Sequence, residues 1–185
     1  MSAVATDRPS PRARSTTAGP VTPARVARTA ASERVRFRPE RVSLPDGASA
    51  PVDPAATVGG VLAVPADIRR VGWWDGSAWV GDPFGSTVVA GHLDAPGQGL
   101  GFFEQLTGLR RGDVVTLTGS GHRAAYRVTE VAAMRKSSID ATSPVFDQRG
   151  EHRLVLMTCA GHFDRATHSY DENLVVTAVP DGAAH

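Results

Sequence analysis

The feature that most constrains the fold is a series of short apolar runs that recur about every ten residues between turn-forming residues. Runs of this length, bounded by Gly and Pro, are typical of β-strands, whereas residues 101–109 carry apolar side chains at near-helical spacing. Many short strands and little helix predict an all-β protein, a closed or nearly closed β-barrel of about eight strands with one or two short helices. The runs are VRF (35–37), RVSLP (41–45), VLAVP (61–65), VGWW (71–74), STVVAGH (86–92), DVVTLTG (113–119), RAAYRVTEVAAM (123–134), HRLVLMTC (152–159) and NLVVTAVP (173–180).

Composition divides the chain into a tail and one folded domain. Residues 1–32 are rich in Ala, Pro, Ser, Thr and Arg without periodicity, which predicts a disordered tail. Residues 1–41 hold nine Arg against three acidic residues, a net charge of +6, while the remainder carries eleven basic and sixteen acidic residues, a net charge of −5. We expect one domain over residues 33–180, with loops at its early prolines, and a short C-terminal tail, 181–185.

The sequence disfavours several classes of partner and cofactor. The basic tail could contact nucleic acid, anionic lipid or an acidic wall polymer, or it could be a solvated linker. The domain lacks zinc-finger spacing and aromatic–basic interleaving, so we expect no nucleic-acid partner. Because Cys159 is the only cysteine, it cannot form an intramolecular disulfide or build a thiolate zinc site alone, and we expect no metal or cofactor.

Cys159 and His92 are the residues best suited to carry chemistry, because each ends a β run beside a Gly-containing loop. A thiol is only a few per cent thiolate near neutral pH, and a neighbouring imidazolium lowers its pKa. Cys159 is therefore either a nucleophile paired with His92 or a small buried apolar side chain. We expect the other histidines to lie in turns or tails exposed to solvent; they are His122, His152, His162, His168 and His185. Of these, His162 and His168 are near enough to Cys159 in sequence to compete with His92 as its partner.

Two longer segments resemble parts of the sortase family. STVVAGHLDAPGQGLGFFEQLTGLRRGDVV (86–115) resembles the histidine-bearing segment of sortases, and LVLMTCAGHFDRATHSYDENLVVTA (154–178) resembles their Thr-Cys strand, loop and closing strand. The LAVP (62–65) and VGWW (71–74) strings are similar to the lead-in of the actinobacterial classes E and F. The resemblance spans roughly Val35 to Pro180 and implies a closed sortase-type β-barrel.

The resemblance also implies roles for individual residues. Cys159 would cleave a C-terminal sorting signal, LPXTG-like, and hold the acyl group as a thioester before its transfer to an amine acceptor. His92 would protonate the leaving amine and later deprotonate the incoming one, and Thr158 would line the substrate site. Two alternatives stay open, a cysteine peptidase that mainly hydrolyses and a non-catalytic, sortase-shaped peptide-binding domain.

The sequence departs from the family at the arginine that serves as substrate anchor and oxyanion donor. Related chains often read Tyr-Arg-Asp-Asn where this one reads Tyr170-Asp171-Glu172-Asn173, and no arginine follows Tyr170. Arg165 could supply the positive charge, Asn173 or backbone N–H groups could form a neutral oxyanion hole, or the enzyme could be impaired or specialised. We place Asp94 with Thr158 and Asn173 among the residues at the substrate site, where Asp94 could orient the His92 imidazole or cap its own loop.

The resemblance implies partners and a location as well. The partners would be the sorting-signal peptide of surface proteins and an amine of peptidoglycan or pilin, bound by a monomer at the extracellular face of the cell membrane. The chain contains no run of 18 apolar residues and no signal-peptide core. We therefore expect that the start of the protein lies upstream or that the membrane anchor has been lost.

Overall fold

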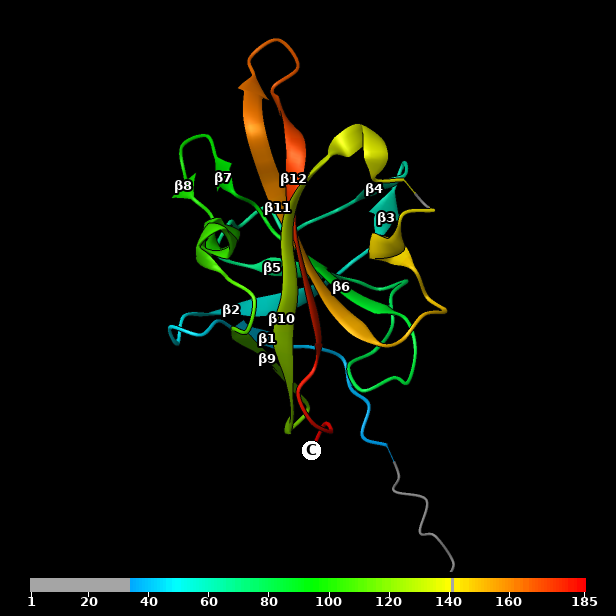
Figure 1. Cartoon of the computed structure of the whole chain (residues 1–185). Coiled ribbons are helices and arrows are strands. Elements are labelled where there is room, and N and C mark those ends of the chain that lie inside the picture. Colours follow the sequence, from blue (N-terminus) through cyan, green and yellow to red (C-terminus); the bar gives the residue numbers. More distant parts are fainter. Residues whose placement is uncertain (1–33, 141) are drawn as a thin grey trace, which may run out of the picture. The chain divides into compact units, whose positions relative to one another are not determined.

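Eight strands form a closed barrel in the computed structural model, which describes residues 34–140 and 142–185 (Figure 1). Around the barrel the order is β1-β2-β5-β6-β11-β12-β10-β9, and β9 pairs with β1 to close the ring. The prediction of a closed, all-β barrel is confirmed, while the predicted tail, 1–32, lies outside the described residues. The strands are β1 (Arg41–Ser43), β2 (Ser49–Ala55), β5 (Val71–Trp74), β6 (Ser86–Ala90), β9 (Val114–Gly119), β10 (His122–Arg135), β11 (Arg153–Asp164) and β12 (Ser169–Pro180).

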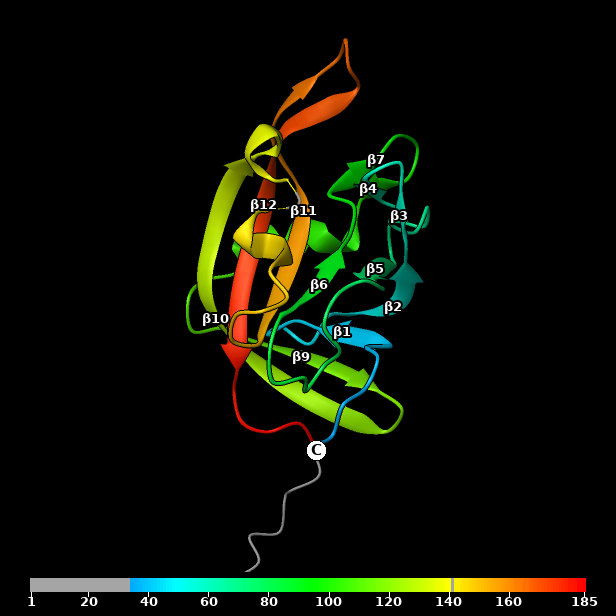
Figure 2. The same cartoon turned by 90° about the vertical axis from the view of Figure 1, so that its right-hand side faces the viewer.

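Smaller elements gather outside the barrel wall. Two short hairpins, β3–β4 and β7–β8, lie toward the same end of the barrel as the tip of the β11–β12 hairpin (Figures 1 and 2). The predicted helix over 101–109 is the 3-10 helix η1, which buries Phe103 and Leu106 against the barrel core. The bounds are β3 (Thr57–Val58), β4 (Val61–Leu62), β7 (Asp94–Ala95), β8 (Gly99–Leu100), η1 (Phe102–Gly108), η2 (Lys136–Ser138) and η3 (Pro144–Phe146).

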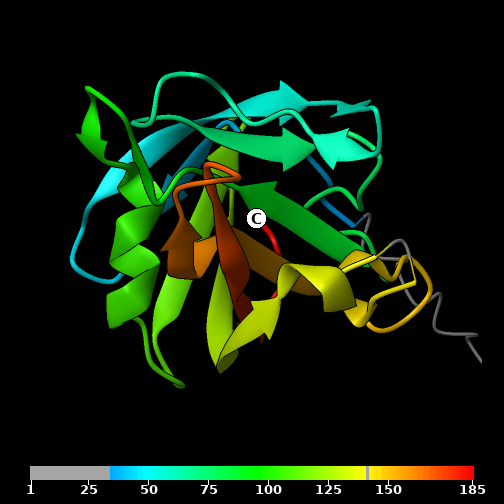
Figure 3. The ribbon, with the colours of Figure 1, turned by 90° about the horizontal axis from the view of Figure 1, so that it is seen from above.

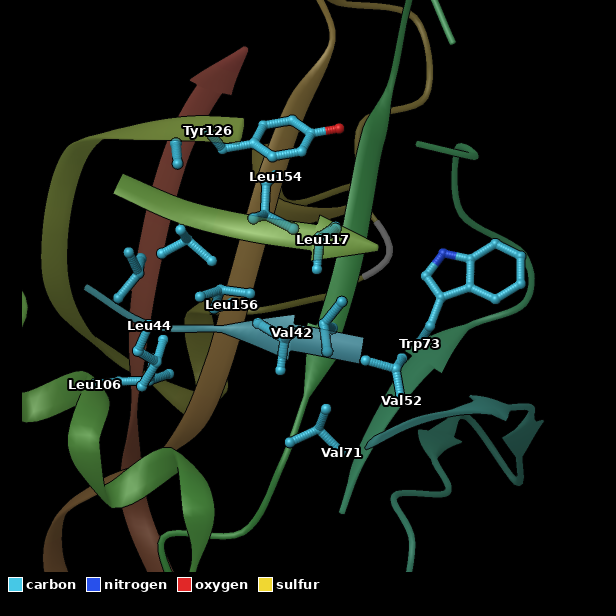
Figure 4. Packing of buried hydrophobic residues seen from close by; sticks show 14 of the residues in the cluster. Val42, Leu44, Val52, Val71, Trp73, Leu106, Leu117, Tyr126, Leu154 and Leu156 are labelled. Atoms are coloured by element: carbon cyan, nitrogen blue, oxygen red, sulfur yellow. The ribbon is translucent and has the colours of Figure 1, made fainter. Parts of the chain in front are cut away.

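The core fills the barrel interior, and a second apolar cluster covers part of its outer wall. Leu154 and Leu156 of β11 point inward with the main cluster (Figure 4). Val155, between them, packs instead against Val145 of η3 in the outer cluster. Successive strand residues face opposite sides, so β11 is buried on both faces, as its apolar run predicts.

The strand predictions fail at two places near the N-terminus. β2 was expected to be a loop because of Pro51 and Pro54, yet it pairs with β1 on one side and β5 on the other. Proline is tolerated in a strand where its nitrogen is not needed as a ladder donor. Conversely, the run 35–37 forms only one bridge, from Phe37 to Val80, and the run 61–65 forms only the two-residue β4 outside the barrel.

The chain end is tied to the barrel. The backbone N–H of His185 donates to the carbonyl of Arg123, and the N–H of Arg123 donates back to the carbonyl of His185. Ala184 packs against the core cluster. Residues 181–185, predicted as a tail, therefore extend the contacts of β10 in this structure.

His152 is buried, which corrects the prediction that it lies exposed in a turn. Only 8% of its surface is exposed, and its Nε2 lies 2.9 Å from the hydroxyl of Tyr126. The residue lies immediately before β11, on the alternation that points Leu154 and Leu156 into the barrel. Burial lowers the pKa of His152 below its ordinary value of 6.5, and burial raises the pKa of Tyr126.

We predict that His152 makes the stability of the barrel depend on pH. Because its folded-state pKa lies below its unfolded value, the unfolded chain binds more protons, so stability is lost as pH falls through about 6.5. The midpoint of urea unfolding, measured between pH 8 and pH 5, should fall less in His152→Gln than in the native sequence. If the urea midpoints of the two proteins fell equally with pH, His152 would not contribute to the pH dependence of stability.

Candidate active site

The parallel pairing of β6 with β11 brings the two predicted reactive residues to one rim. The register places Ala90 beside Met157, and Cys159 and His92 each follow two residues later. The ladder continues past β6, because the N–H of Gly91 donates to the carbonyl of Met157 at 3.0 Å. Parallel strands run in the same direction, so Cys159 and His92 lie at the same level of the barrel. His92 follows the end of β6 as predicted, whereas Cys159 does not end its strand, because β11 continues to Asp164.

Thr158 braces these two strands. Its hydroxyl donates to the carbonyl of Gly91 at 2.9 Å, and the residue is only 2% exposed. Sequence reasoning expected Thr158 to line the substrate site, but this burial leaves little of the side chain for a peptide to contact. The hydroxyl instead ties the strand before Cys159 to the residue before His92.

Cys159 occupies the outer face of the barrel. It continues the alternation of Val155 and Met157, which belong to or pack against the outer apolar cluster. The thiol is half-buried, and the position directly opposite it on β12 is Asn173. Asn173 in turn lies opposite Met134 of β10, so the sulfur has an amide and apolar side chains beside it on the sheet. The alternative of a sealed core cysteine does not fit this position.

The imidazole of His92 is held by a backbone carbonyl. Its Nε2 lies 3.0 Å from the oxygen of Pro65, in the segment that leads from β4 to β5. A carbonyl oxygen can only accept, so Nε2 carries the hydrogen and Nδ1 is the nitrogen left to exchange a proton. Sequence reasoning missed Pro65, because a backbone acceptor 27 residues away leaves no side-chain signal.

Asp94 is engaged by another residue. Its Oδ2 accepts a hydrogen bond of 2.7 Å from the hydroxyl of Tyr170, on β12. This hydrogen bond is the main reason that the pKa of Tyr170 is raised above its ordinary value. Among the described residues, Asp94 makes no hydrogen bond to the His92 ring. It instead links the loop after His92 to the hairpin that carries Cys159.

The residues proposed to replace the missing arginine lie at different positions along the β11–β12 hairpin. Arg165 belongs to the turn that follows Asp164, six residues beyond Cys159 along the hairpin. Asn173 is the direct neighbour of Cys159 across the ladder. Asp171, at the arginine's place in the family pattern, accepts a hydrogen bond from the N–H of His162 at 2.7 Å.

That contact closes an irregularity in the hairpin. The register between β11 and β12 shifts between Ala160 and Phe163, and Gly161 there has a φ of +83°. A Cβ at Gly161 would also clash with the carboxylate of Asp171, so the backbone conformation and the close contact both favour glycine. Neither His162 nor His168, the two competitors for the role of base, is buried beside the sulfur; both are exposed on the hairpin.

The comparison with known families agrees with this geometry. Residues 47–181, most of the chain, match the Sortase domain. The chain belongs to the sortase family. Sortases are cysteine transpeptidases that anchor proteins at the cell surface. No curated protein matches the sequence closely enough to serve as a relative.

Solved sortase structures share the fold at low sequence identity. The SrtA sortase from Actinomyces oris is 17% identical, with a TM-score of 0.58 over 80% of this chain and 82% of its own. Sortase C from Streptococcus pneumoniae is 21% identical, with a TM-score of 0.60 over 82% of this chain and 73% of its own. A lid mutant of sortase A from Corynebacterium diphtheriae is 20% identical, with a TM-score of 0.58 over 81% of this chain and 73% of its own.

The described part of this sortase shows neither a membrane-spanning helix nor a metal-binding cluster. Within residues 34–140 and 142–185, no helix has the length and apolarity needed to cross a lipid bilayer. Over the same residues, no three or more His, Cys, Asp or Glu side chains are grouped so that they could hold a metal ion.

We predict that the Thr158 hydroxyl stabilises the junction of β6 and β11. Thr158→Val keeps the shape of the side chain but leaves the buried carbonyl of Gly91 without this donor, which should cost about 1 kcal/mol of unfolding free energy. Thr158→Ser keeps the hydroxyl and should lie closer to the native value in urea denaturation. Equal stability of Thr158→Val and the native protein would contradict the bracing role.

Proposed function

We propose that this sortase cleaves a sorting-signal peptide through a thioester on Cys159 and transfers the acyl group to an amine. The observation that carries the proposal is the register of β6 and β11, from which Cys159 and His92 emerge together at one rim. The half-buried, outward position of the thiol also supports it, because a peptide lying on the outer wall can reach the sulfur.

The chemistry balances with these two side chains alone. The Cys159 thiolate forms a C–S bond with the peptide carbonyl, the C–N bond breaks, and the leaving amine takes a proton from the His92 imidazolium. The acceptor amine then attacks the thioester, gives its proton back to His92, and releases the thiolate. Because Nε2 of His92 is engaged with Pro65, we assign both proton transfers to Nδ1.

The oxyanion of the tetrahedral intermediate needs donors. Asn173, directly opposite Cys159, is the side chain best supported for this purpose, with backbone N–H groups of β11 beside Cys159 as further donors. Arg165 would have to move from the hairpin turn to take part. We therefore favour a neutral oxyanion site over an arginine in this chain.

The expected substrates follow from the family. We propose a C-terminal sorting signal, LPXTG-like, as the peptide and an amine of peptidoglycan or pilin as the acceptor, with a monomeric enzyme working at the extracellular face of the membrane. The name of the similar Streptococcus pneumoniae structure refers to pilin substrate specificity in that protein. Membership of class E or F stays a prediction based on the LAVP and VGWW strings.

Hydrolysis is the second candidate function, because the arginine that would anchor the peptide is absent from the closing strand. In that case water, rather than an amine, would resolve the thioester. Mixing the protein with an LPXTG-like peptide and a glycine- or lysine-type amine separates the two functions, since only a transpeptidase gives the ligated product.

We predict that the ligation depends on both side chains at the rim. Cys159→Ala should abolish product, and His92→Ala should lower the rate about 100- to 10,000-fold, the usual contribution of acid–base catalysis. The measurement is product formation by mass spectrometry. A native protein whose cysteine alkylates slowly, whose rate of alkylation is indifferent to His92→Ala, and which only binds the peptide would be a non-catalytic domain.

We also predict that Asn173 matters more than Arg165 for the rate. Loss of one oxyanion donor typically costs about 100-fold in kcat, and Asn173→Ala should approach this value. Arg165→Ala should stay within a few-fold of the native rate. The reverse order would assign the oxyanion charge to the hairpin arginine.

A further inference from the structure

The β11–β12 hairpin reaches beyond the barrel, and there it lies past the end of β6, its neighbouring strand on one side. Among the described residues, β6 pairs with β11 only from Arg153 to Met157, so the part of the hairpin after Cys159 has no strand on that side. Figures 1 and 2 show it projecting from the end of the barrel. The geometry at Cys159 therefore depends on what else holds this hairpin.

In the described part of the chain, two side-chain hydrogen bonds tie it to neighbouring elements, one on each flank. Ser169 accepts a hydrogen bond of 2.9 Å from the Nζ of Lys136, at the start of η2. Tyr170, the next residue, donates one of 2.7 Å to Asp94 of β7. Consecutive strand residues face opposite sides, and Figure 3 shows η2 (yellow) and the β7–β8 hairpin (green) on different sides of the β11–β12 hairpin.

The two flanks are not equivalent for the reaction. Lys136 leads into η2, away from His92 in the chain, whereas Asp94 lies two residues after His92. Both bonds are charge-assisted, one through the Asp94 carboxylate and the other through the Lys136 ammonium, so the flanks differ in the segment they contact and not in the type of bond. The Tyr170 ring is held edge-on against Phe163 at a centroid distance of 5.1 Å.

Tyr170 also lies within electrostatic reach of the sulfur. The negative charge of the Cys159 thiolate contributes to raising the pKa of Tyr170, after the larger effects of the hydrogen bond to Asp94, burial and the charge of Asp94. The contact between Tyr170 and Asp94 thus connects the strand pair that carries the nucleophile with the loop that carries the base.

We propose that Tyr170 and Asp94, joined by their hydrogen bond, form a positioning pair. This pair sets how the His92 imidazole approaches the Cys159 sulfur. The inference rests on the proposed function of Cys159 and His92. Neither Tyr170 nor Asp94 takes part in bond making; they fix the Cys159 hairpin to the His92 loop. Small displacements between a nucleophile and its base lower rates strongly, so one bond at this junction has a large effect.

The test compares two hydroxyl deletions on neighbouring residues. Tyr170→Phe removes the bond on the His92 side, and Ser169→Ala, the matched control, removes the bond on the opposite flank and keeps the charge of Lys136. Because Cys159 is the only cysteine, iodoacetamide reports on it alone. Tyr170→Phe should slow alkylation at pH 7 about tenfold, whereas Ser169→Ala should stay within about twofold, because Ser169 contacts η2 and not the loop that carries His92.

The acceptor side gives a second, independent comparison. Asp94→Asn retains an oxygen that can accept from Tyr170 and should keep much of the native rate, whereas Asp94→Ala should match Tyr170→Phe. Combining Asp94→Ala with Tyr170→Phe should add nothing further, because both remove the same bond. Thermal unfolding of each variant checks that the barrel is intact.

A His92→Ala background shows whether the pair acts through the base. There, Tyr170→Phe should have no further effect on the alkylation rate. The inference is overturned if Tyr170→Phe slows alkylation equally with and without His92, or if Ser169→Ala slows it as much as Tyr170→Phe does. If His92→Ala alone changes neither alkylation nor ligation, the proposed function fails, and the inference fails with it; a large effect of His92→Ala beside a silent Tyr170→Phe overturns the inference alone.

Discussion

The parallel ladder between β6 and β11 is the interaction on which the site depends. All five residues of β6 are buried, and the central residues of β11 are buried on both faces, so neither strand can shift without opening the core. The bonds from Gly91 to Met157 and from Thr158 to Gly91 extend this rigid junction up to the reactive residues. Cys159 and His92 therefore take their separation from the barrel and not from their own loops.

Because successive residues of a β-strand face opposite sides, neighbouring residues at this junction have different roles. Thr158 points into the barrel and braces it, whereas Cys159, the next residue, points to the outer wall where a peptide can lie. The same alternation on β12 turns Ser169 and Tyr170 toward different flanks of the hairpin. Neighbouring residues in sequence thus serve separate purposes because the pleat sends them to opposite faces.

Charge around the sulfur differs from what an arginine would provide. Asp171 takes the place of that arginine in the sequence pattern, and its carboxylate is used to close the bulge at Gly161. The nearest ladder neighbour of Cys159 is the neutral Asn173. In the proposed mechanism, the placement of the His92 imidazole therefore carries more weight than it would in a site with a fixed cation.

The amino-acid sequence by itself determined the strand-rich barrel and the two buried faces of β11, because the apolar period is a local property. It also singled out Cys159 and His92 as candidates, although β11 continues past Cys159 to Asp164. It misassigned β2, since Pro51 and Pro54 read as a loop, and it placed His152 outside the barrel. Only the tertiary structure decided which nitrogen of His92 is engaged by Pro65 and that Asp94 meets Tyr170, 76 residues away. Such contacts exist only once the barrel has closed, and no period in the sequence encodes which loops then meet.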